Sequence, residues 1–143
     1  MTTQVVAIHP LDLSTSCALP VFLERVSAGF PSPADDYLDG KLDLNQYLIK
    51  HPAATFLVRV TGDSMVKAGI HSDDRLIVDR SLEPVDGKVV IAVLDGELTV
   101  KRLQCRNGEV RLLAENDGYQ PIDVEGEQAF EIWGVVTHVI HEV

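Results

Sequence analysis

The stretch that decides the fold is VVIAVL-DG-ELTVK, residues 89–101, in which an Asp-Gly pair separates two apolar runs. Asp-Gly between strand-like runs is the strongest short-range signal for a β-hairpin with a two-residue type I′ turn. If this pair forms the turn, the register places Val90 opposite Lys101. The lysine then lies among Val, Ile and Leu side chains, where partial desolvation disfavours the ammonium and lowers its pKa. A neutral lysine of this kind can act as a general base.

The sequence on both sides of this hairpin also consists of short strand-like runs separated by turn residues. Short β-branched runs with Gly, Asp and Asn between them favour an all-β architecture. These runs cover residues 55–60, 75–79, 88–94, 97–103, 109–114 and 130–140. We therefore expect a mainly β domain of short strands over residues 51–143.

The first fifty residues form a different kind of segment, with four of the seven prolines. Short helices are indicated at residues 20–26, which a proline opens, and at residues 42–49, where leucines recur four apart. Between them, AGFPSP (28–33) should be extended and exposed, because proline fixes its own φ and pushes its predecessor toward extended geometry. We interpret residues 1–50 as a flexible N-terminal arm.

Composition narrows the function classes. The 143 residues are enough for one domain, and 12 basic against 22 acidic residues give a net charge of −10. Phosphate neutralisation supplies most non-specific DNA affinity, so this balance argues against direct, specific DNA binding. No apolar run approaches the ~18 residues of a membrane helix, and the N-terminus lacks the basic start of a secretory signal. Two distant cysteines, Cys17 and Cys105, fit a reducing cytoplasm rather than a disulfide scaffold.

A base needs a nucleophile, and the sequence Gly62-Asp63-Ser64-Met65 offers one. It follows a predicted strand, so Ser64 would lie at a strand end, with turn backbone N–H groups nearby that can form an oxyanion hole. Serine with lysine as its base is a known variant of the nucleophile-and-base arrangement. Taken alone, however, most Gly-Asp-Ser serines are turn residues, and most strand lysines are surface residues.

Four segments in fixed order strengthen the pairing: GDSM (62–65), LIVD (76–79), GKVVIA (87–92) and DGELTVKRL (95–103). They resemble the LexA/UmuD family of self-cleaving Ser/Lys peptidases, and the resemblance covers most of residues 55–140. Serine and lysine 37 positions apart is a spacing that this family uses. FPSPADDY (30–37) and HPAAT (51–55) resemble the UmuD branch rather than a repressor, which would carry a helix-turn-helix domain upstream.

The resemblance implies a fold and a reaction. The fold would be the compact LexA/UmuD-type peptidase β-fold, with Ser64 as nucleophile and Lys101 as general base. UmuD-like proteins are cut before the Gly of a small-residue–Gly pair that precedes Phe-Pro, which here is the bond between Ala28 and Gly29. These two small residues would fit a narrow cleft beside Ser64.

The resemblance also implies partners and a role. RecA–single-stranded-DNA filaments would promote the slow cleavage. The truncated homodimer would then serve with a UmuC-like Y-family polymerase catalytic subunit in translesion synthesis during the SOS response. No cofactor is implied, and no membrane partner.

The chain departs from the family's pattern in a few places. Asp73-Asp74 stands where the family often has Gly-Asp, and because Asp tolerates left-handed turns we expect the turn to survive. His138 and His141 are three apart, so on a strand they would face opposite sides, and we expect no metal site.

Three alternative functions compete with this interpretation. A catalytically silent polymerase-accessory interaction module is disfavoured because Ser64, Lys101 and the small cleavage pair are all present. A type I signal peptidase also uses Ser/Lys but needs a membrane anchor. A bare repressor peptidase domain is disfavoured by the arm sequence.

Overall fold

A computed structural model describes the chain apart from residues 17, 23–37, 125 and 127–128. The chain divides into two compact units, one formed by Met1–Leu11 together with His51–Val143 and the other by Asp12–Lys50. An N-terminal arm over residues 1–50 is expected from the sequence, but residues 1–11 belong to the larger unit because they add a strand to its sheet. Among the described residues, no helix is long and apolar enough to cross a membrane.

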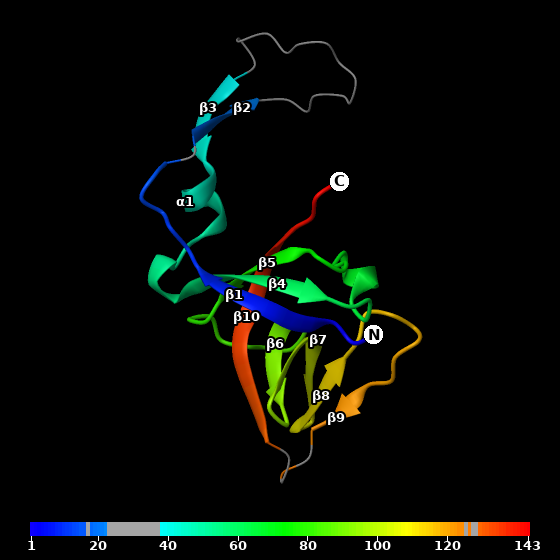
Figure 1. The fold of residues 1–143 in the computed structure, drawn as a ribbon. Helices are drawn as coiled ribbons and strands as arrows, with labels where there is room; N and C mark the ends of the chain where they lie inside the picture. Colours follow the sequence, from blue (N-terminus) through cyan, green and yellow to red (C-terminus); the bar gives the residue numbers. More distant parts are fainter. Residues whose placement is uncertain (17, 23–37, 125, 127–128) are drawn as a thin grey trace. The chain divides into compact units, whose positions relative to one another are not determined.

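The larger unit is built on one antiparallel eight-stranded sheet in the order β1-β4-β5-β10-β6-β7-β8-β9 (Figure 1). A further pairing of Gln4 in β1 with Thr99 in β7 curls the sheet round until it closes on itself. The mainly β fold expected from the sequence is confirmed. The strands are β1 (Gln4–Pro10), β4 (Thr55–Thr61), β5 (Arg75–Asp79), β6 (Val89–Leu94), β7 (Glu97–Arg106), β8 (Glu109–Leu113), β9 (Ile122–Asp123) and β10 (Phe130–Ile140).

The hairpin of β6 and β7 forms as predicted. Asp95 and Gly96 have φ values of 50° and 84°, and a type I′ turn requires positive φ at both central residues. The register pairs Val90 with Lys101, which confirms the count made from the turn. Both residues are buried, so the sheet itself carries the lysine side chain away from water.

Two apolar clusters fill the larger unit, one on each side of the β6–β7 hairpin. Adjacent residues of β6 belong to different clusters because successive side chains on a strand point to opposite faces. Met65, from the turn after β4, is fully buried in the first cluster, and burial of such a side chain stabilises by roughly 1.5–3 kcal/mol. The first cluster contains Val58, Val60, Met65, Ile70, Leu76, Val78, Ile91 and Val100, and the second Val90, Ala92, Leu103, Leu112 and Val135.

The smaller unit contains two antiparallel strands, β2 (Ala18–Phe22) and β3 (Leu38–Asp43), followed by helix α1 (Leu44–Leu48). The Asp43 side chain caps the helix by accepting the Asn45 N–H at 2.9 Å. The helix predicted within residues 42–49 is therefore found. The helix predicted at residues 20–26 is wrong where the chain is described, because residues 20–22 belong to β2. Pairing with β3 there outweighs the weak helix-start signal of a single proline.

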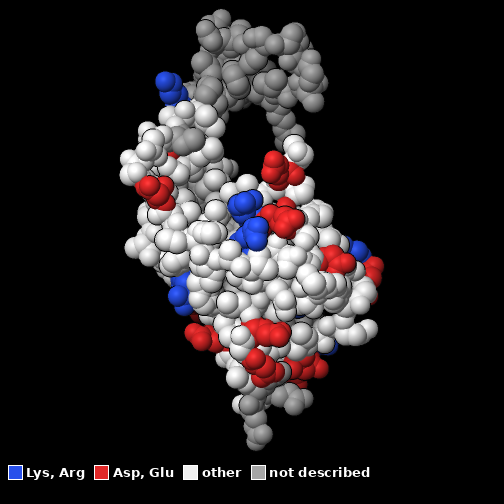
Figure 2. All heavy atoms as spheres, in the orientation of Figure 1, with Lys and Arg blue, Asp and Glu red and all other residues white. Residues whose placement is uncertain are grey.

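The surface carries both signs of charge. On the face drawn in Figure 2, Lys and Arg side chains lie beside Asp and Glu and do not gather into a basic patch. That face therefore offers no electrostatic footprint for a nucleic-acid backbone.

Candidate active site

Ser64 lies in the turn that follows β4, and its side chain is fully buried. Gly62 opens the turn with a φ of 112°, in the region that favours glycine. The backbone on both sides of Ser64 is held from the segment after β8. The Glu115 N–H donates to the Ser64 carbonyl at 2.8 Å, and Asn116 Nδ2 donates to the Asp63 carbonyl at 2.9 Å. The position of the serine is thus fixed by backbone contacts.

Lys101 lies in the middle of β7 with its side chain 2% exposed. Its Nζ is 3.4 Å from Oγ of Ser64, a long hydrogen bond, and 5.5 Å from the centre of the Tyr119 ring. Within the described part of the chain, Lys101 forms no salt bridge. Burial without an anionic partner lowers the pKa of Lys101, because desolvation disfavours the ammonium.

The first residues of the chain lie against this pair. The Thr3 N–H donates to Oγ of Ser64 at 2.8 Å, and the Thr3 carbonyl accepts from the Val100 N–H at 3.0 Å. The Met1 carbonyl accepts from the Asp63 N–H at 2.9 Å. Residues 1–4 therefore run between the serine turn and β7, and the Ser64 hydroxyl already accepts a hydrogen bond from the N-terminal segment.

The amine of Met1 also contacts the serine turn, through Asp63. It lies 2.9 Å from the Asp63 carboxylate, and the Tyr119 hydroxyl bonds to both the amine and the carboxylate. The Tyr119 hydrogen bond, followed by the amine, lowers the pKa of Asp63, and the same bond raises the pKa of Tyr119. Gly62 permits the close approach, since a Cβ there would lie 2.4 Å from the Thr2 carbonyl oxygen.

Comparison with known proteins assigns the chain to a family. A family model described as Peptidase S24-like matches residues 20–137. The chain belongs to the Peptidase S24-like family. It is 50% identical over 123 residues to Protein SamA of Salmonella typhimurium, which is 86% of this chain and 85% of that protein. It is 47% identical over 141 residues to Protein ImpA of Escherichia coli, 93% of this chain and 92% of that protein.

LexA repressor 2 of Pseudomonas putida is 40% identical over 127 residues, which are 89% of this chain and 62% of that protein. These matches confirm the resemblance to the LexA/UmuD family. The S24 peptidase described here is thus, in general terms, a self-cleaving serine peptidase.

The structure brings together two of the predicted site residues from distant elements. Ser64 comes from the turn after β4 and Lys101 from β7, and their polar atoms meet in the interior. Gly62, Asp63 and Met65 form the rest of the turn, as their sequence indicated. Ala28 and Gly29, the predicted cleavage pair, lie outside the described residues.

The N–H groups of the serine turn differ in their availability. Those of Gly62 and Asp63 donate to Ser72 Oγ (3.2 Å) and to the Met1 carbonyl (2.9 Å). Among the described residues, the N–H groups of Ser64 and Met65 have no acceptor. These two N–H groups of the S24 peptidase can therefore still receive an acceptor without breaking a hydrogen bond to a described residue.

Sequence reasoning missed Thr3, Asn116 and Tyr119. Each reaches the serine turn through a contact that spans more than fifty residues of the chain. No local pattern marks such contacts. The only available signal was the Asn-Asp-Gly run at residues 116–118, which indicates a turn but not what that turn supports.

Proposed function

We propose that this S24 peptidase cuts its own chain between Ala28 and Gly29, with Ser64 as nucleophile and Lys101 as general base. The observation that carries the proposal is the 3.4 Å approach of Nζ to Oγ between two side chains that are at most 2% exposed. A lysine with a lowered pKa supplies a neutral amine at a pH where an exposed lysine would remain charged. Lys101 can therefore accept a proton, as a general base must.

The proposed mechanism has two halves. Neutral Lys101 takes the hydroxyl proton as Ser64 Oγ attacks the Ala28 carbonyl carbon, and the N–H groups of Ser64 and Met65 stabilise the oxyanion. The bond to the Gly29 nitrogen then breaks, and Lys101 returns the proton to that nitrogen. A water molecule, deprotonated by Lys101, hydrolyses the acyl-enzyme and restores the serine.

The same proposal includes a role in SOS mutagenesis. It is supported by similarity to SamA and ImpA over most of the chain and by the UmuD-type arm sequence. RecA–single-stranded-DNA filaments stimulate the cleavage, and the truncated homodimer joins a UmuC-like Y-family polymerase for translesion synthesis. The Thr3 contact gives a physical reason for a slow unassisted reaction, because Ser64 stays buried and hydrogen-bonded until residues 1–4 move.

The test is incubation of the purified chain at about pH 10 without any cofactor, because high pH favours the neutral form of Lys101, whose pKa is already lowered. Denaturing gels and intact-mass analysis should show loss of residues 1–28 from the wild type. Ser64→Ala should stay intact. Ser16→Ala, which removes an exposed serine hydroxyl, should be cut at the wild-type rate.

Two results would overturn the proposal. Equal cutting of Ser64→Ala would assign the reaction to another nucleophile. An intact wild type, unchanged by RecA, ATP and single-stranded DNA, would leave the polymerase-accessory interaction module as the better account.

The Thr3 contact makes a separate prediction. Thr3→Pro removes the N–H that donates to Ser64 Oγ and keeps the carbonyl that accepts from Val100. Loss of one net hydrogen bond, about 1 kcal/mol, should raise the cleavage rate roughly fivefold. The matched control is Thr3→Val, which keeps the N–H and removes only a buried hydroxyl that has no partner among the described residues. The cleavage rates are measured as first-order rate constants from gel time courses. Equal rates for the two variants would contradict the prediction.

A further inference from the structure

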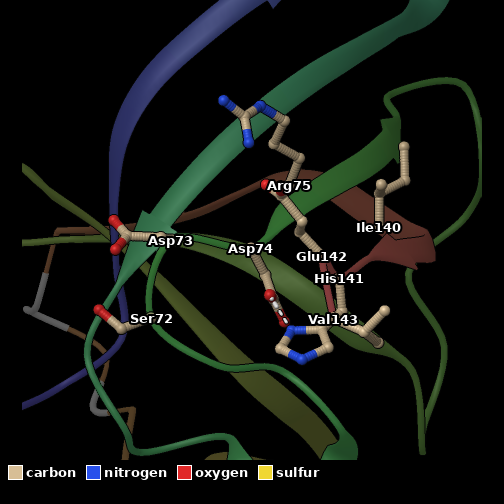
Figure 3. Close-up of a pocket in the computed structure, with 8 residues that line it drawn as sticks. All are labelled: Ser72, Asp73, Asp74, Arg75, Ile140, His141, Glu142 and Val143. Atoms are coloured by element: carbon tan, nitrogen blue, oxygen red, sulfur yellow. Dashed lines mark hydrogen bonds and ion pairs between the residues drawn. The ribbon is translucent and has the colours of Figure 1, made fainter.

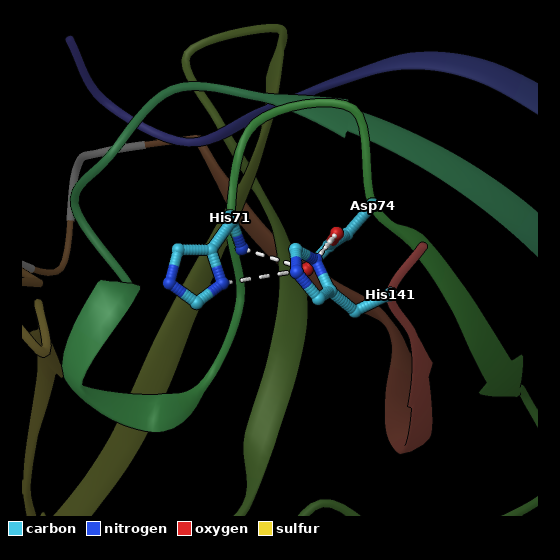
Figure 4. A group of neighbouring side chains, drawn as sticks. All are labelled: His71, Asp74 and His141. Atoms are coloured by element: carbon cyan, nitrogen blue, oxygen red, sulfur yellow. Dashed lines mark hydrogen bonds and ion pairs between the residues drawn. The ribbon is translucent and has the colours of Figure 1, made fainter. Parts of the chain in front are cut away.

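We propose that His71, Asp74 and His141 form a binding site for a divalent transition-metal ion of the Zn²⁺ class. Figure 4 shows both imidazole rings beside the Asp74 carboxylate. His141 Nδ1 lies 2.6 Å from one carboxylate oxygen, and His71 Nδ1 lies 3.8 Å from the other. One ligand atom from each residue can be chosen so that all three lie within 4.8 Å of one another.

The spacing of these atoms suits a small ion. Zn²⁺ binds imidazole nitrogen and carboxylate oxygen at about 2.0–2.2 Å, which puts tetrahedral ligand atoms about 3.4 Å apart. The observed separations of 2.6 and 3.8 Å lie on either side of that value. Binding therefore needs a small rotation of His141, which exchanges its hydrogen bond to Asp74 for a bond to the metal. Two imidazoles with one carboxylate form a donor set that Zn²⁺ and similar divalent transition-metal ions accept.

The carboxylate is held in place before any ion arrives. Asp74 is 3% exposed, and the His71 N–H donates to its Oδ2 at 2.8 Å. The turn that carries it is tied to β4, since Asp73 N–H donates to the Val60 carbonyl at 2.8 Å and Val60 N–H to the Asp74 carbonyl at 3.1 Å. Asp73 has a φ of 72°, so the left-handed turn expected at this departure from the family pattern is present. Such fixed surroundings orient a metal ligand at low cost.

The site is open on the side of the imidazoles. The side chains of His71 and His141 are 50% and 47% exposed. A surface pocket lined by the turn and the end of the chain adjoins them (Figure 3), so water can complete the coordination shell. Arg75 also lines this pocket, but Figure 3 shows its guanidinium pointing away from the His141 ring.

A bound ion would join two parts of the larger unit. His141 follows the end of β10, and His71 and Asp74 belong to the turn before β5. Between them in that turn, Ser72 Oγ accepts the Gly62 N–H at 3.2 Å, at the start of the serine turn. An ion that binds only the folded chain stabilises it by mass action. The proposed site thus acts as a structural clamp behind the serine turn.

The test uses the full-length, tag-free chain, freed of metal with a chelator and then titrated with Zn²⁺ by calorimetry. We expect one ion per chain and a melting temperature that rises with Zn²⁺. His71→Ala and His141→Ala should each weaken binding at least tenfold. His138→Ala, which removes a histidine from β10 just before His141, should bind as the wild type does. Unchanged affinity in either of the first two variants, or no binding by the wild type, would overturn the site.

Cobalt gives a direct view of the ligands. Co²⁺ bound to the wild type should show visible d–d absorption that Zn²⁺ displaces. His141→Cys should keep the metal and add a thiolate-to-cobalt charge-transfer band, since a cysteine there offers a sulfur ligand in place of the ring nitrogen. Absence of that band in a folded, cobalt-binding variant would place the ion elsewhere. Thermal unfolding in chelator checks that each variant is folded without metal.

Discussion

Lys101→Met should abolish self-cleavage and, at neutral pH, make the folded chain more stable than the wild type. The cleavage rate should fall at least a thousandfold, because methionine cannot take the proton from Ser64. Stability should rise because Lys101 is 2% exposed, without a salt bridge among the described residues, and desolvation lowers its pKa. Each unit of lowering corresponds to about 1.4 kcal/mol at a pH below the lowered value. Methionine fills a similar volume without this penalty.

The sign of the stability change also depends on pH. Between the lowered pKa of Lys101 and the ordinary value of 10.5, the unfolded chain binds more protons than the folded chain. Wild-type stability therefore rises with pH across that window and is lowest below it. The advantage of Lys101→Met should accordingly shrink as pH approaches 10.5.

Urea unfolding of both chains across this range measures the difference. Lys88→Met, which replaces an exposed lysine next to the same hairpin, should cleave normally and change stability little. A Lys101→Met chain that is less stable than the wild type at neutral pH would contradict the assignment of desolvation as the main cause of the pKa shift.

The second large effect is the pH dependence of cleavage. The rate should rise about tenfold per pH unit while Lys101 is mostly protonated and should level off above its lowered pKa, because only the neutral amine accepts the serine proton. Initial rates from intact-mass time courses between about pH 6 and pH 10 cover the expected rise. A rate that stays flat over this range would remove lysine as the base.

Tyr119 provides the control for that profile, since the centre of its ring lies 5.5 Å from Lys101 Nζ and its hydroxyl also titrates at high pH. Its hydrogen bond to Asp63 raises its pKa, so its ionisation lies above the range in which the rate should rise. Tyr119→Phe should therefore leave the inflection of the profile in place. An inflection that moved with this substitution would show that ionisation of Tyr119, not of Lys101, controls the rate.

The hairpin could be predicted from the sequence because its information is local. Asp95-Gly96 determines the turn, and the turn determines the register that buries Lys101 beside Val90. The approach of Lys101 to Ser64 was different, since no pattern within either segment specifies it. That contact was expected only because the order and spacing of four motifs resembled a family.

The remaining errors come from pairing across long stretches of chain. β1 was missed because the first residues read as part of a proline-containing arm, and their partner strand β4 lies about fifty positions away. β2 was taken for a helix because the signal of Pro20 is weak beside the pairing with β3. The cluster of His71 and His141 has the same origin, because the register of β10 against β5 brings the two segments together.

The contact of the terminal amine with Asp63 makes the chemistry of the chain end part of the peptidase. Formylation or acetylation of Met1 would erase the positive charge that Asp63 and Tyr119 share. A purification tag fused ahead of Met1 would do the same, because the added residue would convert the amine that contacts Asp63 into a neutral amide. The charge on the first residue should therefore be the same in all preparations whose cleavage rates are compared.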